Sequence, residues 1–292
     1  MQVHLLDGTY ELFRHHFGVP SHLDRDGVEV AAVRGVLGTV LTMLEDGATH
    51  LGVATDHVIE SFRNDLWPGY KTGAGIDPEL LAQFPLLEDG LEALGAKVWA
   101  MVDQEADDAL AAAAAVAAAD ERVAQVLVCT PDKDLAQCVS DPRIAQLDRR
   151  HGKLLDEAAV REKFGVGPRS IPDWLALVGD SADGFPGLPG WGAKSAATVL
   201  ARYEHIDAIP DDGATWDVTV RSAPKLAATL ATHRAEAKLF LDLATLRTDT
   251  PVGAVDDWRW RGPQPELADW AERLGSTNLM SRAERAAKGR DS

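Results

Sequence analysis

Short apolar runs alternate with helix-like segments along the first 165 residues of the chain. The runs lie at residues 3–6, 51–55, 98–102, 126–129 and 145–147. They are short and partly β-branched, which is typical of buried parallel strands. Helical patterns lie between them, at residues 31–44, 78–94, 106–119 and 134–139. This alternation predicts βαβ units, and therefore an α/β fold with a mainly parallel sheet flanked by helices.

From residue 166 onward the pattern becomes all-helical, with segments at 171–178, 195–203 and 224–241. We therefore expect an α/β domain at residues 1–165, a helical module at 166–250 and a tail at 251–292 whose last ten residues are frayed. The tail carries Trp258, Trp260 and Trp270. Their spacing is more typical of packing residues than of a platform for stacking nucleotide bases.

The chain is strongly acidic: 46 Asp and Glu against 29 Lys and Arg give 292 residues a net charge of −17. Such a balance argues against a broadly basic nucleic-acid surface, although local positive stripes matter more than the total. The N-terminus shows no signal peptide, and the alanine-rich stretch at 109–119 is too short to span a membrane. Cys129 and Cys138 have no metal-finger spacing, so we expect a reduced, cytoplasmic protein that avoids membranes.

Acidic residues follow five apolar runs directly, which changes the meaning of the negative charge. Four clusters follow predicted strands and the fifth follows the predicted helix 171–178; the nine residues are Asp7, Asp56, Glu105, Asp107, Asp108, Asp132, Asp134, Asp180 and Asp183. Ligands bind at the carboxyl ends of strands in open α/β sheets. Carboxylates gathered there repel one another unless cations neutralise them, so the pattern predicts hard divalent metals with oxygen ligands.

Acids in the first turn of a helix also complement its dipole, and this alternative explains Glu105, Asp107 and Asp108 when that segment is taken alone. It explains the whole set less well, because Asp132 and Asp134 occur at the next strand end. Five clusters in matching positions favour a metal site.

A glycine-rich turn links two predicted helices. Its candidate DNA-binding residues are Gly187, Gly190, Gly192, Lys194 and Ser195. Glycines let a backbone approach a phosphate, and the next helix offers free N–H groups and a partial positive charge. The alternatives are a plain interhelical turn and a nucleotide-binding P-loop. The P-loop is rejected because Ala193 is an extra residue before the lysine and no strand precedes the turn.

The segment at residues 61–71 places Arg63, Tyr70 and Lys71 soon after Asp56. Cations suit phosphate, and aromatic faces suit single strands. A solvated surface loop is an equally simple interpretation. Arg14 has two interpretations as well, as a phosphate contact or as the partner of a surface ion pair.

With these residues in place, the chain resembles the 5′-3′ exonuclease and flap endonuclease family, which includes the 5′-nuclease domain of bacterial DNA polymerase I and its stand-alone relatives. The resemblance covers roughly residues 1–250, and its elements occur in the family's order. They are Leu6-Asp7-Gly8, Asp56, Phe62-Arg63, Gly69-Tyr70-Lys71, Glu105-Ala106-Asp107-Asp108, Asp132-Lys133-Asp134-Leu135, Gly179-Asp180-Ser181-Ala182-Asp183 and Gly190-Trp191-Gly192-Ala193-Lys194.

The resemblance implies a PIN-like domain with a helical arch at about 61–92, followed by a helix–three-turn–helix module. It implies two Mg²⁺ or Mn²⁺ ions: one on Asp7, Asp56, Glu105, Asp107 and Asp108, and one on Asp132, Asp134, Asp180 and Asp183. Lys71 and Arg63 match the family's catalytic cations, which steer the scissile phosphate. The hairpin would contact DNA and, as in some relatives, hold a potassium ion.

Two features depart from the family pattern. Gly184 stands where the family usually has Asn, so we expect an altered turn with the metal ligands kept. The arch region at 72–92 is poor in Lys and Arg and rich in acids, which indicates a weaker grip on a flap or a shorter arch.

The function expected is a structure-dependent 5′ nuclease that hydrolyses DNA with 5′ ends, flaps or nicks by a two-metal mechanism. We expect a stand-alone enzyme, with a monomer favoured and a nucleoid-associated location. Two other interpretations use the same fold: a non-catalytic DNA-structure-binding protein and a PIN-type ribonuclease.

Overall fold

The computed structural model describes residues 1–289 of the chain. These residues form two compact units that interleave along the sequence. The first, called here the sheet unit, comprises 1–59, 73–130 and 248 onward; the second, the helical unit, comprises 60–72 and 131–247. The units follow compactness and not chain order, so the boundaries expected near residues 165 and 250 stay predictions.

Four parallel strands form the centre of the sheet unit, in the order β3-β2-β1-β4. They are β1 (Gln2–Asp7), β2 (His50–Asp56), β3 (Lys97–Met101) and β4 (Gln125–Cys129). The register pairs Asp7 with Ala54, Leu6 with Cys129 and Asp56 with Met101. The four carboxyl ends therefore finish at one edge, which confirms the predicted parallel arrangement.

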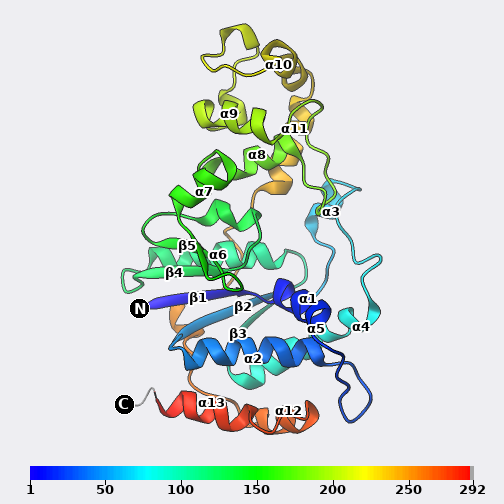
Figure 1. Cartoon of the computed structure of the whole chain (residues 1–292), viewed down its shortest axis with the longest axis vertical. Helices are drawn as coiled ribbons and strands as arrows, with labels where there is room; N and C mark the ends of the chain where they lie inside the picture. The colour runs from blue at the N-terminus through cyan, green and yellow to red at the C-terminus, as the bar shows by residue number, and fades with distance from the viewer. Residues whose placement is uncertain (290–292) are drawn as a thin grey trace. The chain divides into compact units, whose positions relative to one another are not determined.

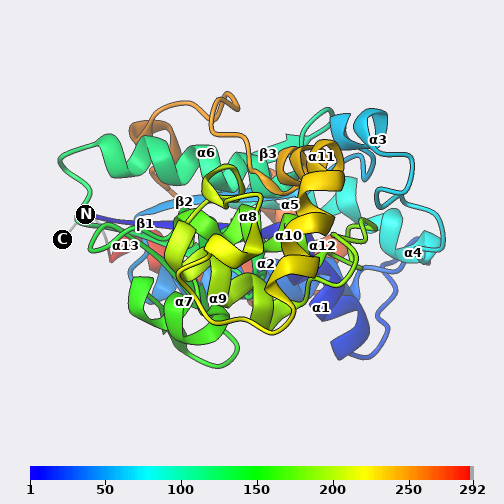
Figure 2. The ribbon, with the colours of Figure 1, turned by 90° about the horizontal axis from the view of Figure 1, so that it is seen from above.

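Helices cover both faces of these strands (Figures 1 and 2). Figure 2 shows α6 (Ala106–Ala119) on one side, and α1 (Gly8–Gly18) and α2 (Ala31–Glu45) on the other. The other helices of the sheet unit that precede β3 are α4 (Pro78–Leu81) and α5 (Gln83–Leu94). The alanine-rich composition of α6 suits its position, because small side chains let a helix pack closely over a sheet while keeping high helix propensity.

The last part of the sheet unit is well packed. It contains η5 (Val255–Trp258), α12 (Leu267–Arg273) and α13 (Leu279–Lys288). Trp258 is 1% exposed and packs edge-to-face on Trp99, with ring centroids 5.4 Å apart. Both indole N–H groups donate to the carbonyl of Val252. The expectation of fraying from residue 283 is wrong as far as Lys288, and for residues 290–292 it lies outside the described part of the chain.

The helical unit contains one short antiparallel pair and a series of helices. The pair is β5 (Ile144–Asp148) and β6 (Lys153–Leu155). Its helices are α3 (Phe62–Leu66), α7 (Glu157–Phe164), α8 (Ile171–Val178), α9 (Ala193–Tyr203), α10 (Ala223–Thr232) and α11 (Arg234–Ala244). Short 3₁₀ turns are η1 (Asp134–Cys138), η2 (Pro168–Ser170), η3 (Ile206–Ala208) and η4 (Gly213–Thr215).

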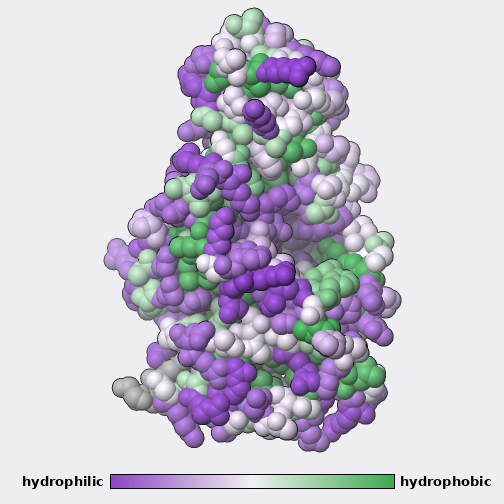
Figure 3. Space-filling model, in the orientation of Figure 1, coloured by the Kyte–Doolittle hydropathy of each residue, from purple (hydrophilic) through white to green (hydrophobic). Residues whose placement is uncertain are grey.

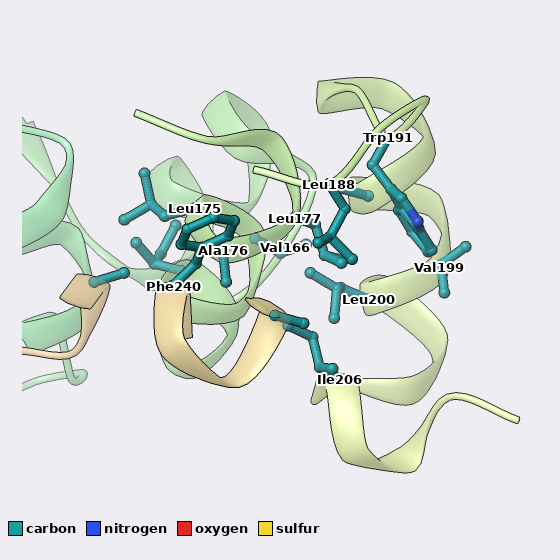
Figure 4. Packing of buried hydrophobic residues seen from close by; sticks show 14 of the residues in the cluster. Val166, Leu175, Ala176, Leu177, Leu188, Trp191, Val199, Leu200, Ile206 and Phe240 are labelled. Carbon is teal, nitrogen blue, oxygen red and sulfur yellow. The ribbon is translucent and has the colours of Figure 1, made fainter. Parts of the chain in front are cut away.

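Leucine and aromatic side chains form the core of the helical unit, shown in Figure 4. Leu175 and Leu177 of α8 lie among Leu200 of α9 and Phe240 of α11. This core fixes α8 and α9, and hence the turn between them. The expected helical module is confirmed, and its long stretch at 224–241 is divided into α10 and α11 at His233.

Candidate metal centre and nucleic-acid interface

In the sheet unit, two of the predicted ligands end strands and the others begin a helix. Asp7 ends β1 and also caps α1, because its Oδ1 accepts the N–H of Tyr10 at 2.8 Å. Its Oδ2 accepts the hydroxyl of Thr130, just after β4, at 2.9 Å. Asp56 ends β2, and its Oδ1 accepts the backbone N–H of Ala106 at 2.8 Å. The strand-end aspartates are thus fixed in orientation by neighbouring backbone and hydroxyl groups.

The N-terminus of α6 lies against this strand edge. The backbone N–H of Glu105 donates to Asp108 Oδ2 at 3.0 Å, which closes the first turn of the helix. The side chain of Asp108 is fully buried and Glu105 is 4% exposed. Acids at a helix N-terminus complement the dipole, so this structural role and metal binding use the same groups. Asp107 lies in the same turn.

In the helical unit, three predicted ligands come together in one cluster. Asp134 begins η1, and Asp180 and Asp183 lie in the turn after α8. One carboxylate oxygen from each lies within 4.8 Å of the others. Within the part of the chain that the structure describes, the other predicted ligands form no group this close. Asp132 adjoins the cluster, and its carboxylate accepts the N–H of Asp134 at 2.9 Å.

The electrostatics of the cluster favour a cation. Burial raises the pKa of the Asp134 carboxyl well above its usual value, and the negative charges of Asp132, Asp183 and Asp180 raise it further. Asp134 Oδ1 is buried and accepts no hydrogen bond from any described residue. A divalent metal with oxygen ligands fits this group of carboxylates, because it neutralises their repulsion and occupies the unused lone pairs.

Two lysines now face the three carboxylates. Lys133 forms an ion pair with Asp180, and its Nζ lies 3.8 Å from Asp134 Oδ1. Burial lowers the pKa of Lys133, but the charges of Asp134 and Asp180 outweigh burial and hold that pKa above its usual value. Lys71 Nζ lies 3.0 Å from Asp183 Oδ1. Sequence reasoning named Lys71 and gave no role to Lys133, although its position between two predicted ligands was the available signal.

A close contact between two glycines positions the segment that carries Lys71. Gly184 has φ of 84°, and a Cβ on it would lie 2.0 Å from the carbonyl oxygen of Gly69. The carbonyl of Gly184 accepts the indole N–H of Trp67 at 3.0 Å, and the backbone N–H of Lys71 donates to the carbonyl of Asp183 at 3.0 Å. The residue that departs from the family pattern is therefore the residue that lets the two segments touch.

Arg63 and Tyr70, from the same segment as Lys71, are buried. Arg63 is 1% exposed, and its guanidinium donates to the carbonyl oxygens of Leu243 at 2.8 Å and Thr245 at 3.3 Å. Tyr70 is 4% exposed and belongs to the core of the helical unit. For either side chain to touch a nucleic acid, this packing would have to open.

The turn between α8 and α9 has the shape of a tight hairpin. Gly187 is buried, and a Cβ there would lie 2.3 Å from the backbone nitrogen of Gly179, so this glycine serves a close backbone approach. Gly190 has φ of 82° and is exposed. Ser195 closes the first turn of α9 by accepting the N–H of Gly192 at 3.0 Å. Lys194 is exposed at the start of α9.

Arg14 lies on α1 of the sheet unit. Its Nε donates to Glu11 Oε2 at 3.1 Å, so its guanidinium already has an acidic partner. Of the two interpretations left open by the sequence, the ion pair is present, and contact with a phosphate stays a prediction.

An α/β sheet whose acidic strand ends are followed by a helical hairpin module defines the class of this protein. Comparison with known protein families identifies the family within this class. Residues 2–165 match the 5′-3′ exonuclease N-terminal resolvase-like domain, and residues 166–266 match the 5′-3′ exonuclease C-terminal SAM fold. The chain belongs to the 5′-3′ exonuclease family, a family of metal-dependent nucleases.

Curated relatives include DNA polymerase I of Pseudomonas aeruginosa, 34% identical over 273 residues, which cover 90% of this chain and 29% of that protein. DNA polymerase I of Rhizobium leguminosarum is 32% identical over 294 residues, covering 97% of this chain and 28% of that protein. The chain thus spans less than a third of the length of these relatives.

Solved structures with the same fold include the bacteriophage T5 flap endonuclease in a pseudo-enzyme–product complex with DNA and metal ions. It has a TM-score of 0.65, 17% identity and coverage of 100% of both chains. The flap endonuclease-1 of Methanococcus jannaschii has a TM-score of 0.60 and 13% identity, and the match covers 99% of this chain and 93% of that one. At such identities the likeness supports the fold.

In residues 1–289, no helix combines the length and apolar composition needed to cross a bilayer.

Proposed function

We propose that this chain is a structure-dependent 5′ nuclease that hydrolyses DNA phosphodiesters, as a 5′-3′ exonuclease, a 5′-flap endonuclease or both. The observation that carries the proposal is the buried group of Asp134, Asp180 and Asp183 with Lys71 beside it. Three carboxylates this close favour a divalent cation, and an ammonium beside them suits a phosphate. Family membership supports the same reaction class.

Two divalent cations, Mg²⁺ or Mn²⁺, would supply an activated water and stabilise charge on the attacking and leaving oxygens. We propose one centre on Asp132, Asp134, Asp180 and Asp183, and one on Asp7, Asp56, Glu105, Asp107 and Asp108. The role of the protein is geometric: the backbone N–H groups of Tyr10 and Ala106 hold Asp7 and Asp56 in orientation before a metal arrives.

Lys71 is proposed to neutralise charge on the scissile phosphate in the transition state. Its ammonium now contacts Asp183, and a cation bound by that carboxylate would release it toward substrate. Arg63 stays in the proposal as a second cation, acting from its buried position. Arg14 and Tyr70 stay as proposed DNA contacts that require local rearrangement.

The hairpin is proposed to hold the DNA backbone through the exposed Gly190 and Lys194 and the half-buried Gly192 and Ser195, with Gly187 shaping the turn. A potassium ion on its carbonyl oxygens is part of the same proposal. We also propose that the chain acts as a monomer on flaps, nicks and 5′ ends, in the cytoplasm and near the nucleoid.

The direct test is cleavage of a labelled 5′-flap DNA in Mg²⁺ by the native chain and by Asp180→Asn. Loss of several kcal/mol of transition-state stabilisation predicts a rate at least about 10²-fold lower. Asp207→Asn is the control, because Asp207 is an exposed acid of the same unit, outside the cluster. Equal rates for the native chain and Asp180→Asn would remove the assigned centre.

Two further arms separate the other interpretations. A chain that binds the flap in EDTA and never cleaves it with metal would be a DNA-structure-binding protein. Faster cleavage of an RNA flap than of the DNA flap would indicate a ribonuclease.

A further inference from the structure

Lysine side chains supply the positive charge that the structure places against the cluster of Asp134, Asp180 and Asp183. Lys133 forms an ion pair with Asp180, and its Nζ lies 3.8 Å from Asp134 Oδ1. Lys71 contacts Asp183 instead, with 3.0 Å between its Nζ and Oδ1 of the carboxylate. Lys133 therefore contacts two members of the cluster, and the proposed function has so far given it no task.

The ion pair of Lys133 differs from surface pairs of the helical unit in the burial of its acid. Arg202 pairs with Asp217, and these two side chains are 55% and 51% exposed. The side chain of Asp180 is 4% exposed and that of Lys133 is 34% exposed. Figure 3 shows hydrophilic side chains spread over the visible face of this unit, among neutral and apolar ones. Exposed pairs contribute little, whereas a lysine that reaches a buried carboxylate offsets a large desolvation cost.

Hydrogen bonds fix the main chain around Lys133 and leave its side chain able to turn away. The N–H of Asp134 donates to Asp132 Oδ1 at 2.9 Å, and the side-chain amide of Gln146 donates to the carbonyl of Asp132. The carbonyl of Lys133 accepts the N–H of Ala136 at 3.1 Å. The lysine side chain is unbranched and partly exposed, so it can rotate into solvent while the turn that carries the carboxylates stays in place.

The ammonium of Lys133 and a divalent cation would use the same carboxylate oxygens. Asp134 Oδ1 and Asp180 Oδ2 are the oxygens that Lys133 contacts, and both are buried and accept no hydrogen bond from residues 1–289. A divalent cation on these carboxylates would be repelled by an ammonium a few ångströms away. A group that occupies a site for part of the time also reduces the apparent affinity of any ligand that needs that site free.

We propose that Lys133 is an internal counter-ion that holds the carboxylate cluster together and competes with the divalent cation for it. The inference rests on the proposed function and deepens it, because it names the residue that sets how much metal this centre requires. Lys133 has to leave Asp180 before a divalent cation binds there. Removing the ammonium therefore has two opposite effects, lower stability in a chelator and tighter binding of metal. A residue that only supported the fold would lower both.

The experiment measures Mn²⁺ binding to the full chain without DNA, by isothermal titration calorimetry, together with thermal melts in EDTA. Lys133→Gln should bind Mn²⁺ at least about fivefold more tightly than the native chain, because the competing charge is gone. In EDTA it should melt about 2–4 °C lower, because a buried carboxylate loses its partner. Asp180→Asn, which disables this centre, identifies the signal of the centre in the titration.

Two further variants separate charge from other effects. Lys133→Arg keeps the positive charge, so its affinity for Mn²⁺ should stay within about threefold of native. Lys238→Gln removes an exposed lysine on α11 of the same unit and should change neither readout. If Lys133→Gln does not fold, Lys133→Met takes its place with the same expected shift in affinity, because methionine keeps an unbranched apolar stem and lacks the charge.

Several outcomes overturn the inference. Weaker Mn²⁺ binding by the folded Lys133→Gln variant would make Lys133 a support of the site and not a competitor. Equal tightening by Lys238→Gln would show a general charge effect. Unchanged Mn²⁺ binding by Lys133→Gln, with flap cleavage by the native chain, would remove the inference and leave the proposed function standing. Tighter Mn²⁺ binding by Lys133→Gln in a chain that cleaves no flap would support the inference and remove the proposed function.

Discussion

Burial and metal binding favour opposite protonation states of the Asp134 carboxyl. Its carboxyl is buried beside three other carboxylates, which raises its pKa, and its Oδ1 accepts no hydrogen bond from residues 1–289. In the metal-free protein the neutral form is therefore favoured by folding. A bound cation would reverse this preference, because the charged form is the ligand.

The raised pKa of Asp134 sets the direction in which stability changes with pH. A folded-state pKa above the unfolded value gives stability that is full below the ordinary carboxyl pKa and is lost as pH rises through the raised pKa. In EDTA at pH 7.5, Asp134→Asn should therefore melt roughly 2–4 °C above the native chain, as for about 1 kcal/mol at this size. The gap should close near pH 4. Thermal melts check this, and a lower melting temperature for Asp134→Asn in EDTA at pH 7.5 would contradict it.

Lys71 belongs to the same scale, and its prediction concerns rate. Lys71→Gln keeps a polar side chain and removes the ammonium, so cleavage of the flap should slow by about 10²-fold while duplex binding changes by less than about threefold. Lys238→Gln, an exposed lysine on α11, serves as the control. A larger loss in binding than in kcat would move Lys71 from chemistry to docking.

At the scale of elements, the sequence pattern predicted the helices with strong local propensity. It missed a helix and a helix break that depend on contacts. The alanine-rich segment 106–119 and the apolar 171–178 were predicted with the observed bounds, because propensity and pattern agree there. Helix α1 was not predicted, since it begins at Gly8 and is started by the Asp7 cap. The break at His233 between α10 and α11 was not predicted, because no glycine or proline marks it in the sequence.

The turn at 180–185 carries the element-scale prediction. Gly184→Ala would strain a φ of 84° and drive a Cβ into the carbonyl of Gly69, displacing the segment that holds Lys71. We expect kcat to fall at least about tenfold and the melting temperature to drop. Gly152→Ala is the matched control, because Gly152 has φ of 60° with open space around it. Equal rates for the two variants would show that backbone strain alone accounts for any effect.

At the scale of the whole molecule, residues distant in sequence complete each unit. The sheet unit is closed by residues from 248 onward, and the helical unit takes in residues 60–72 from near the N-terminus. The tail expected from the sequence is therefore part of the folded core of the sheet unit. Arg282 of α13 pairs with Glu45 of α2, and Trp260 donates its indole N–H to Leu94 at 2.8 Å.

Substitution of Trp258 tests whether the C-terminal segment stabilises the sheet unit. Trp258→Ala removes a ring that is 1% exposed and stacked edge-to-face on Trp99, so unfolding free energy should fall by about 3–5 kcal/mol. Trp258→Phe should recover most of the loss, since it keeps an aromatic ring and loses the hydrogen bond to Val252. Urea unfolding measures both. A loss below about 1 kcal/mol for Trp258→Ala would show that this segment is peripheral.

The sequence by itself determined the strands and most helices, the order of the acidic motifs and the family, because these depend on local pattern and residue identity. Tertiary structure alone decided which carboxylates gather closely, since Asp134 and Asp180 lie far apart along the chain. It also buried Arg63, brought Gly184 against Gly69 and placed Lys133 against Asp180. Contacts of this kind depend on how elements pack, which no local pattern records.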